Sequence, residues 1–204
     1  EGGEIIPRCE NFTLSPMDET HVPVFSHRAF TNYPGIEQNT VHMVDWMAKN
    51  RFNRFMIFAN VEGALEKYKS VLRDEVLVRG MKVMFGHLSF KFWLPPAEQF
   101  SLHPQWFAMV QGERIADGQI CTSNPEVIEY VTGQIAKCFD ENPEIDTVGL
   151  WPNDGFGWCE CPECLALEPQ QESEFYPPFN CRTDTYLKFV NEVAKRIATS
   201  HPDR

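Results

Sequence analysis

Three cysteines within a short segment carry the most distinctive chemistry in the sequence. They form the motif Cys159-x-Cys161-x-x-Cys164. Thiolates at this spacing can converge on one tetrahedral zinc ion, with a fourth ligand from elsewhere in the chain. Cys121 is our first choice for that ligand, and Cys181 is the second. A disulfide from Cys121 or Cys181 to one of the three is the alternative, and the spacing does not decide between zinc and disulfide.

The pair Asn153–Asp154 is the second candidate, and it lies in the segment Trp-Pro-Asn-Asp at 151–154. An amide next to a carboxyl group can orient a substrate and deliver a proton to it. Burial against Trp151 and Trp158 would favour the protonated form of Asp154. The plainer interpretation is a turn, because Asn, Asp and Gly are common turn residues.

The elements that must position these residues follow a regular order. The apolar spacing alternates between strand-like and helix-like periods along the chain. We expect strands at 22–30, 54–59, 81–86 and 146–151, each followed by a helix, at 37–50, 61–79, 124–140 and 183–199. Strands that alternate with helices predict a parallel sheet and an α/β fold.

Two closed architectures compete for these strand–helix repeats. A doubly wound sheet usually has a glycine-rich phosphate-binding turn, and the sequence has none. A TIM-like (β/α)8 barrel needs eight repeats, and only about four are evident. We therefore interpret residues 1–204 as a single α/β domain, half of a TIM-like barrel that belongs to a larger enzyme. A self-contained sheet of four or five strands is the alternative.

Candidate binding residues follow the strands of this expected sheet. Arg28 ends the first strand, Asn60 follows the second and His87 follows the third. Barrel enzymes bind their substrates at the carboxyl ends of the strands. We therefore expect these side chains to share one cavity with Asp154, where the Arg28 guanidinium could make forked hydrogen bonds to adjacent hydroxyl groups of a ligand. Without a ligand role, Arg28 would form an ion pair and His87 would be an ordinary loop histidine.

The connection from residue 87 to 122 is long and rich in aromatic residues, which favours a functional loop. Trp93 in this connection and Trp151 after the fourth strand can stack against sugar rings. Aromatic side chains are also common in protein cores, so both interpretations stay open.

Composition narrows the range of partners. The net charge of −11 and the pI near 5.0 argue against nucleic acid as a partner. No apolar run is long enough to span a bilayer. If the chain is half a barrel, its open sheet edges favour a homodimer.

Four segments carry a family resemblance: NTVHMVDWMAKNRFNRF (39–55), HPQWFAMVQGERI (103–115), QICTSNPEVIEYV (119–131) and VGLWPNDGFGWCECPEC (148–164). They resemble the bacterial domain-of-unknown-function 4838 family of the glycoside-hydrolase TIM-barrel clan. Some members of that family are classed as endo-β-N-acetylglucosaminidases. The last segment is the most specific of the four.

The resemblance implies a carbohydrate substrate and a secreted or periplasmic location. It implies a glycoside hydrolase-like domain that acts on N-acetylhexosamine-containing glycans, with retention, through the substrate's own N-acetyl group. In that scheme Asn153 would orient and stabilise the oxazolinium, and Asp154 would be the acid/base. A non-catalytic carbohydrate-binding module is one alternative. An α-glucuronidase-like hydrolase is another, and it would need a further basic residue near Arg28.

Overall fold

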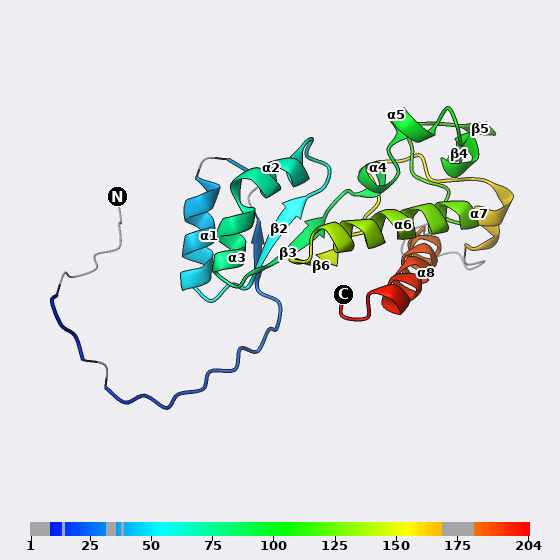
Figure 1. The fold of residues 1–204 in the computed structure, drawn as a ribbon. Helices are drawn as coiled ribbons and strands as arrows, with labels where there is room; N and C mark the ends of the chain where they lie inside the picture. Colours follow the sequence, from blue (N-terminus) through cyan, green and yellow to red (C-terminus); the bar gives the residue numbers. More distant parts are fainter. Residues whose placement is uncertain (1–8, 14, 32–35, 38, 169–181) are drawn as a thin grey trace.

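A computed structural model gives the structure of the chain and describes residues 9–13, 15–31, 36–37, 39–168 and 182–204. Its centre is a parallel sheet in the order β1-β2-β3-β6 (Figure 1). The strands are β1 (Ala29–Thr31), β2 (Arg54–Phe58), β3 (Lys82–Gly86) and β6 (Ile145–Val148). All neighbouring strands pair in parallel, which confirms the predicted α/β class with repeated strand–helix units.

Helices connect these strands. The helix after β1 is α1 (Thr40–Lys49), and α2 (Ala64–Val71) and α3 (Arg73–Val78) follow β2. The long helix α6 (Pro125–Glu141) precedes β6, and α8 (Thr183–Ser200) is the last helix of the described residues. Asn124 caps α6 by accepting a hydrogen bond from the backbone N–H of Glu126, with Pro125 in the first turn.

One face of the sheet forms the core and the other is less covered. Phe55 and Ile57 of β2 are buried and alternate with half-buried neighbours, and in β3 the buried Val83 and Phe85 flank the half-buried Met84. These four side chains pack into the core with apolar residues of the helices. The opposite face, with Met56, is only half-buried. An inner face with this partial cover is what half of a barrel would leave.

Two of the predicted elements differ in the structure. The first strand is only three residues long, because only Ala29–Thr31 pair with β2, while Val22, Val24 and Phe25 are exposed. The single helix expected over 61–79 is two helices that meet at Leu72. Leu72 is nevertheless fully buried, so the apolar stripe that predicted the helix still faces the core.

The long connection between β3 and α6 contains short elements. They are α4 (Phe90–Trp93), α5 (Pro96–Gln99), a 3-10 turn (Pro104–Trp106) and the antiparallel pair of β4 (Met109–Val110) and β5 (Glu113–Arg114). A further short helix, α7 (Pro162–Ala166), lies in the connection after β6. Residues 169–181 lie outside the described residues, and Cys181, the second choice for the fourth zinc ligand, is one of them.

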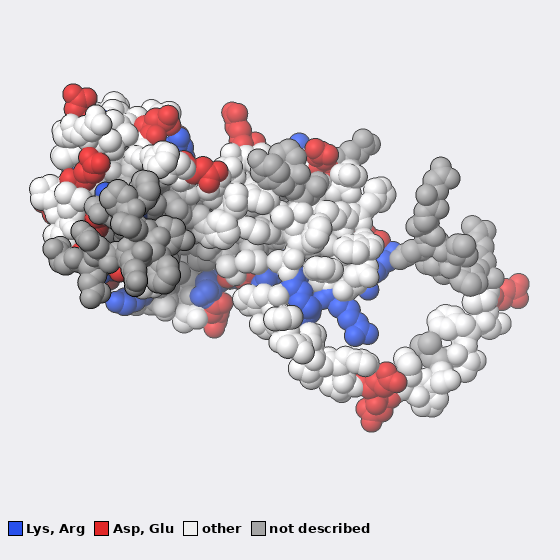
Figure 2. Space-filling model, turned by 180° about the vertical axis from the view of Figure 1, so that it is seen from behind, with Lys and Arg blue, Asp and Glu red and all other residues white. Residues whose placement is uncertain are grey.

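Charged side chains of both signs are visible on the surface in Figure 2, where Lys and Arg gather on the lower side of the view and Asp and Glu are spread more widely. Within the described residues, no helix combines the length and the apolar character needed to cross a membrane.

Candidate functional site

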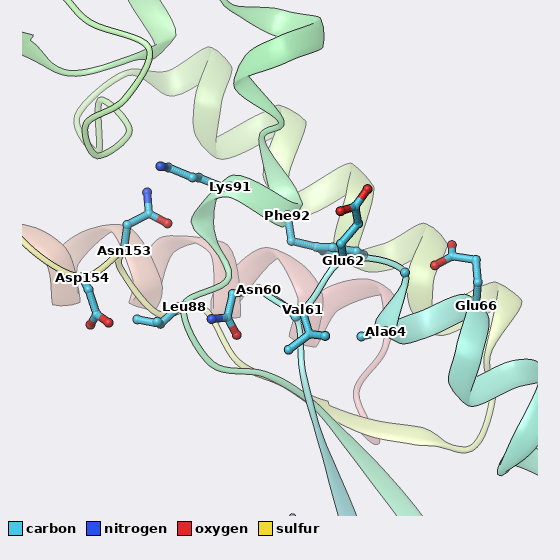
Figure 3. A pocket seen from close by; sticks show the side chains of 12 residues that line it. Asn60, Val61, Glu62, Ala64, Glu66, Leu88, Lys91, Phe92, Asn153 and Asp154 are labelled. Carbon is cyan, nitrogen blue, oxygen red and sulfur yellow. The ribbon is translucent and has the colours of Figure 1, made fainter. Parts of the chain in front are cut away.

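A pocket of about 450 Å³ opens where the connections after β2, β3 and β6 meet (Figure 3). Asn60 and Glu62 line it from the β2 side, Leu88 from the β3 side, and Asn153 and Asp154 from the β6 side. The carboxyl ends of parallel strands therefore bring together three of the residues that the sequence singled out. Barrel enzymes bind their substrates at the carboxyl ends of the strands.

The backbone turns sharply after β3. His87 has φ 66° and Leu88 has φ 45°, both in the left-handed region. A non-glycine residue in this region costs roughly 1–3 kcal/mol, so surrounding contacts must hold the turn in place. The His87 ring packs edge-on against Phe58, with 4.3 Å between ring centroids, and lies 5.1 Å from Trp151. Its Nδ1 atom is buried without a hydrogen-bond partner among the described residues.

The strands β3 and β6 come unusually close where they end. A Cβ atom added at Gly86 would lie 2.5 Å from Cα of Gly149, and one added at Gly149 would lie 2.9 Å from Cα of Gly86. Both contacts are with backbone atoms, which cannot move away as a flexible side chain would. Only a glycine pair permits this approach, which brings His87 and Trp151 together.

Buried groups of α4 fix the start of the β6 connection. The hydroxyl of Ser89 donates to the carbonyl of Gly149 at 2.6 Å and accepts from the N–H of Trp151 at 3.0 Å. The indole N–H of Trp93 donates to the same Gly149 carbonyl at 3.1 Å. Trp93 is only 2% exposed. The predicted sugar-stacking role of Trp93 is therefore wrong, because its ring is buried in the core and its one polar atom is already paired.

Gln119 holds Asn153 in place from the other side. Oε1 of Gln119 accepts from the backbone N–H of Asn153 at 2.9 Å, and its Nε2 donates to the Asn153 carbonyl at 2.8 Å. The side-chain amide of Asn153 donates to the carbonyl of Gly118 at 3.1 Å. Gln119 is fully buried. Asn153 is thus oriented by the protein, and its Oδ1 atom is the part of the side chain left to accept from a ligand.

Asp154 is exposed at the pocket edge, so the expected burial of its carboxyl group against Trp151 and Trp158 is wrong. Asn60 is exposed as well. Trp151 is 45% exposed and contacts His87 beside the pocket, which leaves a face open for a ligand.

The sequence analysis missed three charged residues of the pocket. Glu62 and Glu66 line it from the connection after β2 and the first turn of α2, and Lys91 lines it from α4. Lys91 pairs with Asp117 at 2.6 Å. Position after a strand is the signal that identified Asn60, and it would also have found Glu62. Lys91 could not be found this way, because α4 folds back over the strand end.

Arg28 lies at the amino ends of the strands, opposite to the pocket. It directly precedes β1, and its carbonyl accepts from the N–H of Asn53, the residue before β2. Its guanidinium donates to the carbonyls of Arg51 and Phe25 at 2.7 and 2.6 Å. The prediction that Arg28 shares a cavity with Asp154 is therefore wrong. It failed because the strand expected over 22–30 begins only at Ala29, so Arg28 precedes the strand instead of lying near its end.

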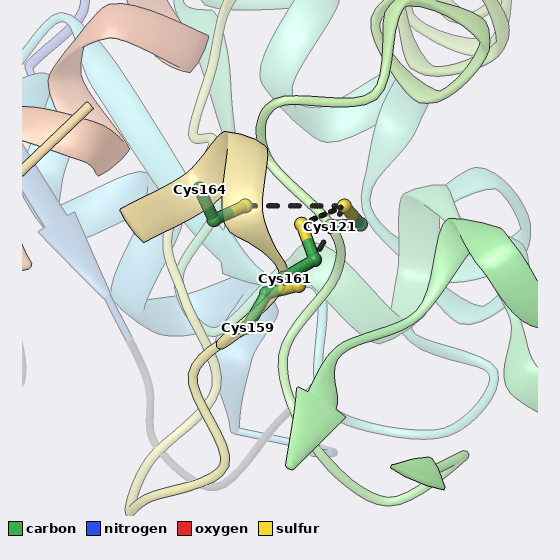
Figure 4. Close-up of side chains that lie close together, drawn as sticks. All are labelled: Cys121, Cys159, Cys161 and Cys164. Carbon is green, nitrogen blue, oxygen red and sulfur yellow. Dashed lines mark hydrogen bonds between the residues drawn. The ribbon is translucent and has the colours of Figure 1, made fainter. Parts of the chain in front are cut away.

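The four predicted zinc ligands converge in a second, separate cluster (Figure 4). Sγ of Cys121 lies 3.6, 3.7 and 3.9 Å from the sulfurs of Cys159, Cys161 and Cys164. All four sulfurs lie within 4.8 Å of one another, and all four residues are buried. The described residues thus contain a cluster that could bind a metal ion, and its chemistry fits soft, thiolate-bound metals such as zinc.

Hydrogen bonds and buried neighbours perturb the thiols of this cluster. Hydrogen bonds with Cys159 and then Cys164 hold the pKa of Cys121 well below its ordinary value. The hydrogen bond to Cys121 is also the main cause that raises the pKa of Cys159 to about 11. The two pKa shifts have opposite signs because the Cys159 thiol donates its hydrogen bond to Sγ of Cys121, which favours the thiolate of Cys121 and the thiol of Cys159. Cys9 and Cys138 lie outside the cluster and are free.

Solved glycosidases share the fold. A variant of the GH36 alpha-galactosidase AgaA from Geobacillus stearothermophilus, in complex with stachyose, matches with a TM-score of 0.53 and 14% identity over 87% of this chain and 27% of that one. The beta-galactosidase from the psychrophilic Marinomonas ef1 matches with a TM-score of 0.50 and 12% identity over 87% of this chain and 36% of that one. No curated protein matches the sequence.

The chain spans only about a quarter to a third of the length of these enzymes. The likeness shows the fold alone, and this fold is consistent with part of a TIM-like barrel. The sequence itself matches the family described as Domain of unknown function (DUF4838) over residues 2–204, and the chain therefore belongs to that family.

Proposed function

We propose that this chain supplies the acid/base side of a glycoside hydrolase site that acts on N-acetylhexosamine-containing glycans. The observation that carries the proposal is the pocket at the carboxyl ends of β2, β3 and β6, which contains both Asn153 and Asp154. The shared fold with glycosidases supports a carbohydrate substrate.

In the proposed reaction Asp154 protonates the glycosidic oxygen as the bond to the leaving sugar breaks. The carbonyl oxygen of the substrate's N-acetyl group attacks the anomeric carbon, which gives an oxazolinium intermediate. Asp154 then removes a proton from the water that opens this intermediate, so the anomeric configuration is retained. No covalent bond to the protein forms.

Asn153 orients the acetamido group in this scheme. Its side-chain amide is engaged with Gly118, so Oδ1 is the atom that accepts the acetamido N–H. A fixed acceptor raises the rate because the reacting carbonyl is held close to the anomeric carbon. Trp151 and Asn60 contact the sugar from two sides of the pocket mouth.

Asp154→Asn in the intact protein tests the proposal. We expect hydrolysis of N-acetylglucosamine-containing N-glycans to fall by about 10²–10⁴-fold, the usual contribution of a general acid/base. The melting temperature should not change, because Asp154 is exposed. Asp74→Asn is the matched control, since Asp74 is an exposed carboxylate on α3 outside the pocket. Unchanged turnover in Asp154→Asn would refute the assignment.

Substrate assistance has its own test. A thiazoline analogue of N-acetylglucosamine mimics the oxazolinium, so it should inhibit the intact enzyme competitively, and the product should keep the configuration of the substrate. Product of inverted configuration would overturn the mechanism. Glycan binding without hydrolysis would favour the carbohydrate-binding module, and cleavage of glucuronides alone would favour the α-glucuronidase-like hydrolase.

We also propose a secreted or periplasmic location, where such glycans occur. Cell fractionation of the native source, with the intact protein detected by antibody, tests it. Recovery of the protein in the cytosolic fraction alone would contradict the proposal.

A further inference from the structure

We propose that Cys121, Cys159, Cys161 and Cys164 bind one structural zinc ion, and that this ion holds the connection after β6 against the connection after β3. The proposal goes beyond the proposed function, because no step of glycan hydrolysis needs the metal. If zinc binds there, it also stabilises the contact that orients Asn153.

The distances between the sulfurs match a tetrahedral zinc site. A zinc–sulfur bond of about 2.3 Å gives tetrahedral sulfur–sulfur edges of about 3.8 Å. Sγ of Cys121 lies 3.6, 3.7 and 3.9 Å from the other three sulfurs. These three edges lie close to the tetrahedral value, and the remaining three sulfur–sulfur distances are at most 4.8 Å. An ion at the centre would draw these sulfurs together through side-chain movement.

The same distances disfavour a disulfide in the cluster. A disulfide joins two sulfurs at about 2.05 Å and leaves the other cysteines out of the bond. Cys121 instead lies at nearly equal distances from its three neighbours, and each of them is free. An arrangement without a preferred pair is expected when all four sulfurs bind one centre.

The groups around the cluster compensate the charge of bound thiolates. The backbone N–H of Met109 and the guanidinium of Arg114 donate to Sγ of Cys159 at 3.4 and 3.6 Å. The hydroxyl of Ser123 lies 3.1 Å from Sγ of Cys164. Four thiolates around Zn²⁺ leave two negative charges, and binding releases up to four protons from the thiols. Arg114 offsets part of this charge.

A closed ligand shell assigns the ion a structural role. The four cysteines are between 1% and 3% exposed and would fill all four positions of the metal, so no position is left for water or substrate. A hollow of about 360 Å³, lined by Arg114, Cys121 and Cys161, opens beside the cluster. It provides a path by which the ion can enter.

The cluster is linked to Asn153 through a short chain of hydrogen bonds. Cys121 comes two residues after Gln119, and Cys159 comes two residues after Gly157. The backbone N–H of Gln119 donates to the carbonyl of Gly157 at 2.9 Å, and Gln119 bonds in both directions with the Asn153 backbone. Zinc would therefore tie together the two segments whose contact orients Asn153.

Metal analysis of the intact protein tests the site itself. We expect one zinc per chain after purification without added metal, and release of that zinc when a mercurial reagent reacts with four thiols. Substitution with Co²⁺ should give the intense visible and near-ultraviolet bands of a tetrahedral thiolate site. Iron in place of zinc, disulfides within the cluster, or metal-free reactive thiols would each overturn the proposal.

Single variants locate the site. Cys121→Ser and Cys161→Ser should each lower the zinc content or weaken zinc binding at least about tenfold. Cys138→Ala is the matched control, because Cys138 is also buried and free but lies in the main core. Because a ligand variant can fail to fold, chelator titration of the wild-type protein provides the same comparison without a mutation. Equal zinc retention by Cys121→Ser and Cys138→Ala would contradict the ligand assignment.

Hydrogen exchange tests the positioning role without any assay of glycan hydrolysis. After removal of zinc, exchange of the Gln119 and Asn153 amides should accelerate at least about tenfold, because both amides donate across the tied segments. Amides of the middle of α6 should keep their protection. Zinc loss that leaves the Asn153 amide equally protected would overturn the positioning role.

Discussion

The amino ends and the carboxyl ends of the parallel strands differ in the interactions of their side chains. At the amino ends, Arg28 donates to backbone carbonyls and Arg54 pairs with Asp146 at 2.6 Å. At the carboxyl ends, Asn60, Glu62 and Asp154 are exposed around a pocket. The charged side chains named at the amino ends hold neighbouring segments together, whereas the exposed side chains named at the carboxyl ends surround a pocket that a ligand can enter.

Left-handed backbone occurs at both ends of the strands. Arg51, which precedes β2, has φ 64°, and His87 and Leu88, which follow β3, have φ 66° and 45°. The close contact of Gly86 with Gly149 lies at the carboxyl ends. Unfavourable conformations of this kind persist only where surrounding contacts hold them, and they are common at functional sites. The following predictions test the contrast between the side chains at the amino ends and those at the carboxyl ends of the strands.

The largest effect is expected for Gly86→Ala. The new methyl group would lie 2.5 Å from Cα of Gly149, so the ends of β3 and β6 must separate. We expect the free energy of unfolding to fall by at least about 3 kcal/mol, measured by urea denaturation. Gly133→Ala in α6 is the control, because nothing lies within 4 Å of its added Cβ and alanine should stabilise the helix. Similar stability of both variants would contradict the predicted contact.

Gln119→Ala should have the next largest effect. It leaves the N–H and carbonyl of the half-buried Asn153 without these partners, which costs roughly 1–3 kcal/mol. We expect lower stability together with a loss of glycan hydrolysis, since Asn153 is no longer oriented. Gln134→Ala in α6 serves as the control. If Gln119→Ala kept full activity, Gln119 would have only a structural role.

Arg28→Ala should affect stability alone. The guanidinium loses its hydrogen bonds to the carbonyls of Arg51 and Phe25, so we expect a loss of about 1–2 kcal/mol in thermal or urea unfolding. The kcat/KM for glycans should stay within twofold of wild type. A large fall in kcat/KM at unchanged stability would show that the amino ends of the strands also contribute to hydrolysis.

The smallest effect is expected for Glu62→Gln. Under substrate assistance the N-acetyl group is the nucleophile, so the exposed carboxylate of Glu62 contributes only to binding. We expect a fall in kcat/KM of less than about tenfold, mainly through KM. A loss as large as that expected for Asp154→Asn would identify Glu62 as a second catalytic carboxylate and would contradict substrate assistance.

The strand–helix order could be predicted from the sequence because apolar periodicity is a local property. The runs at 54–59 and 81–86 predicted β2 and β3 closely, and the helix expected over 124–140 matches α6 within one residue at each end. The spacing of Cys159, Cys161 and Cys164 predicted a shared centre. The prediction that Cys121 completes the cluster used the family-like segment around it, and the structure confirms that the four cysteines converge.

Other features depend on contacts between distant segments and could not be predicted. Arg28 lies at the amino ends of the strands and not at the predicted carboxyl ends, because β1 is limited to the three residues that pair with β2. The burial of Trp93 follows from the folding of α4 against the core. The bonds from Gln119 to Asn153 join residues 34 positions apart.

Apolar periodicity and position after a strand were enough to predict the α/β class, the parallel strand–helix repeats and three residues of the pocket, because both are local properties of the chain. The exposure of each tryptophan, the location of Arg28 at the amino ends of the strands and the orientation of Asn153 could not be predicted in this way. They depend on burial and hydrogen-bond partners, which are set by the packing of segments that are distant in the sequence.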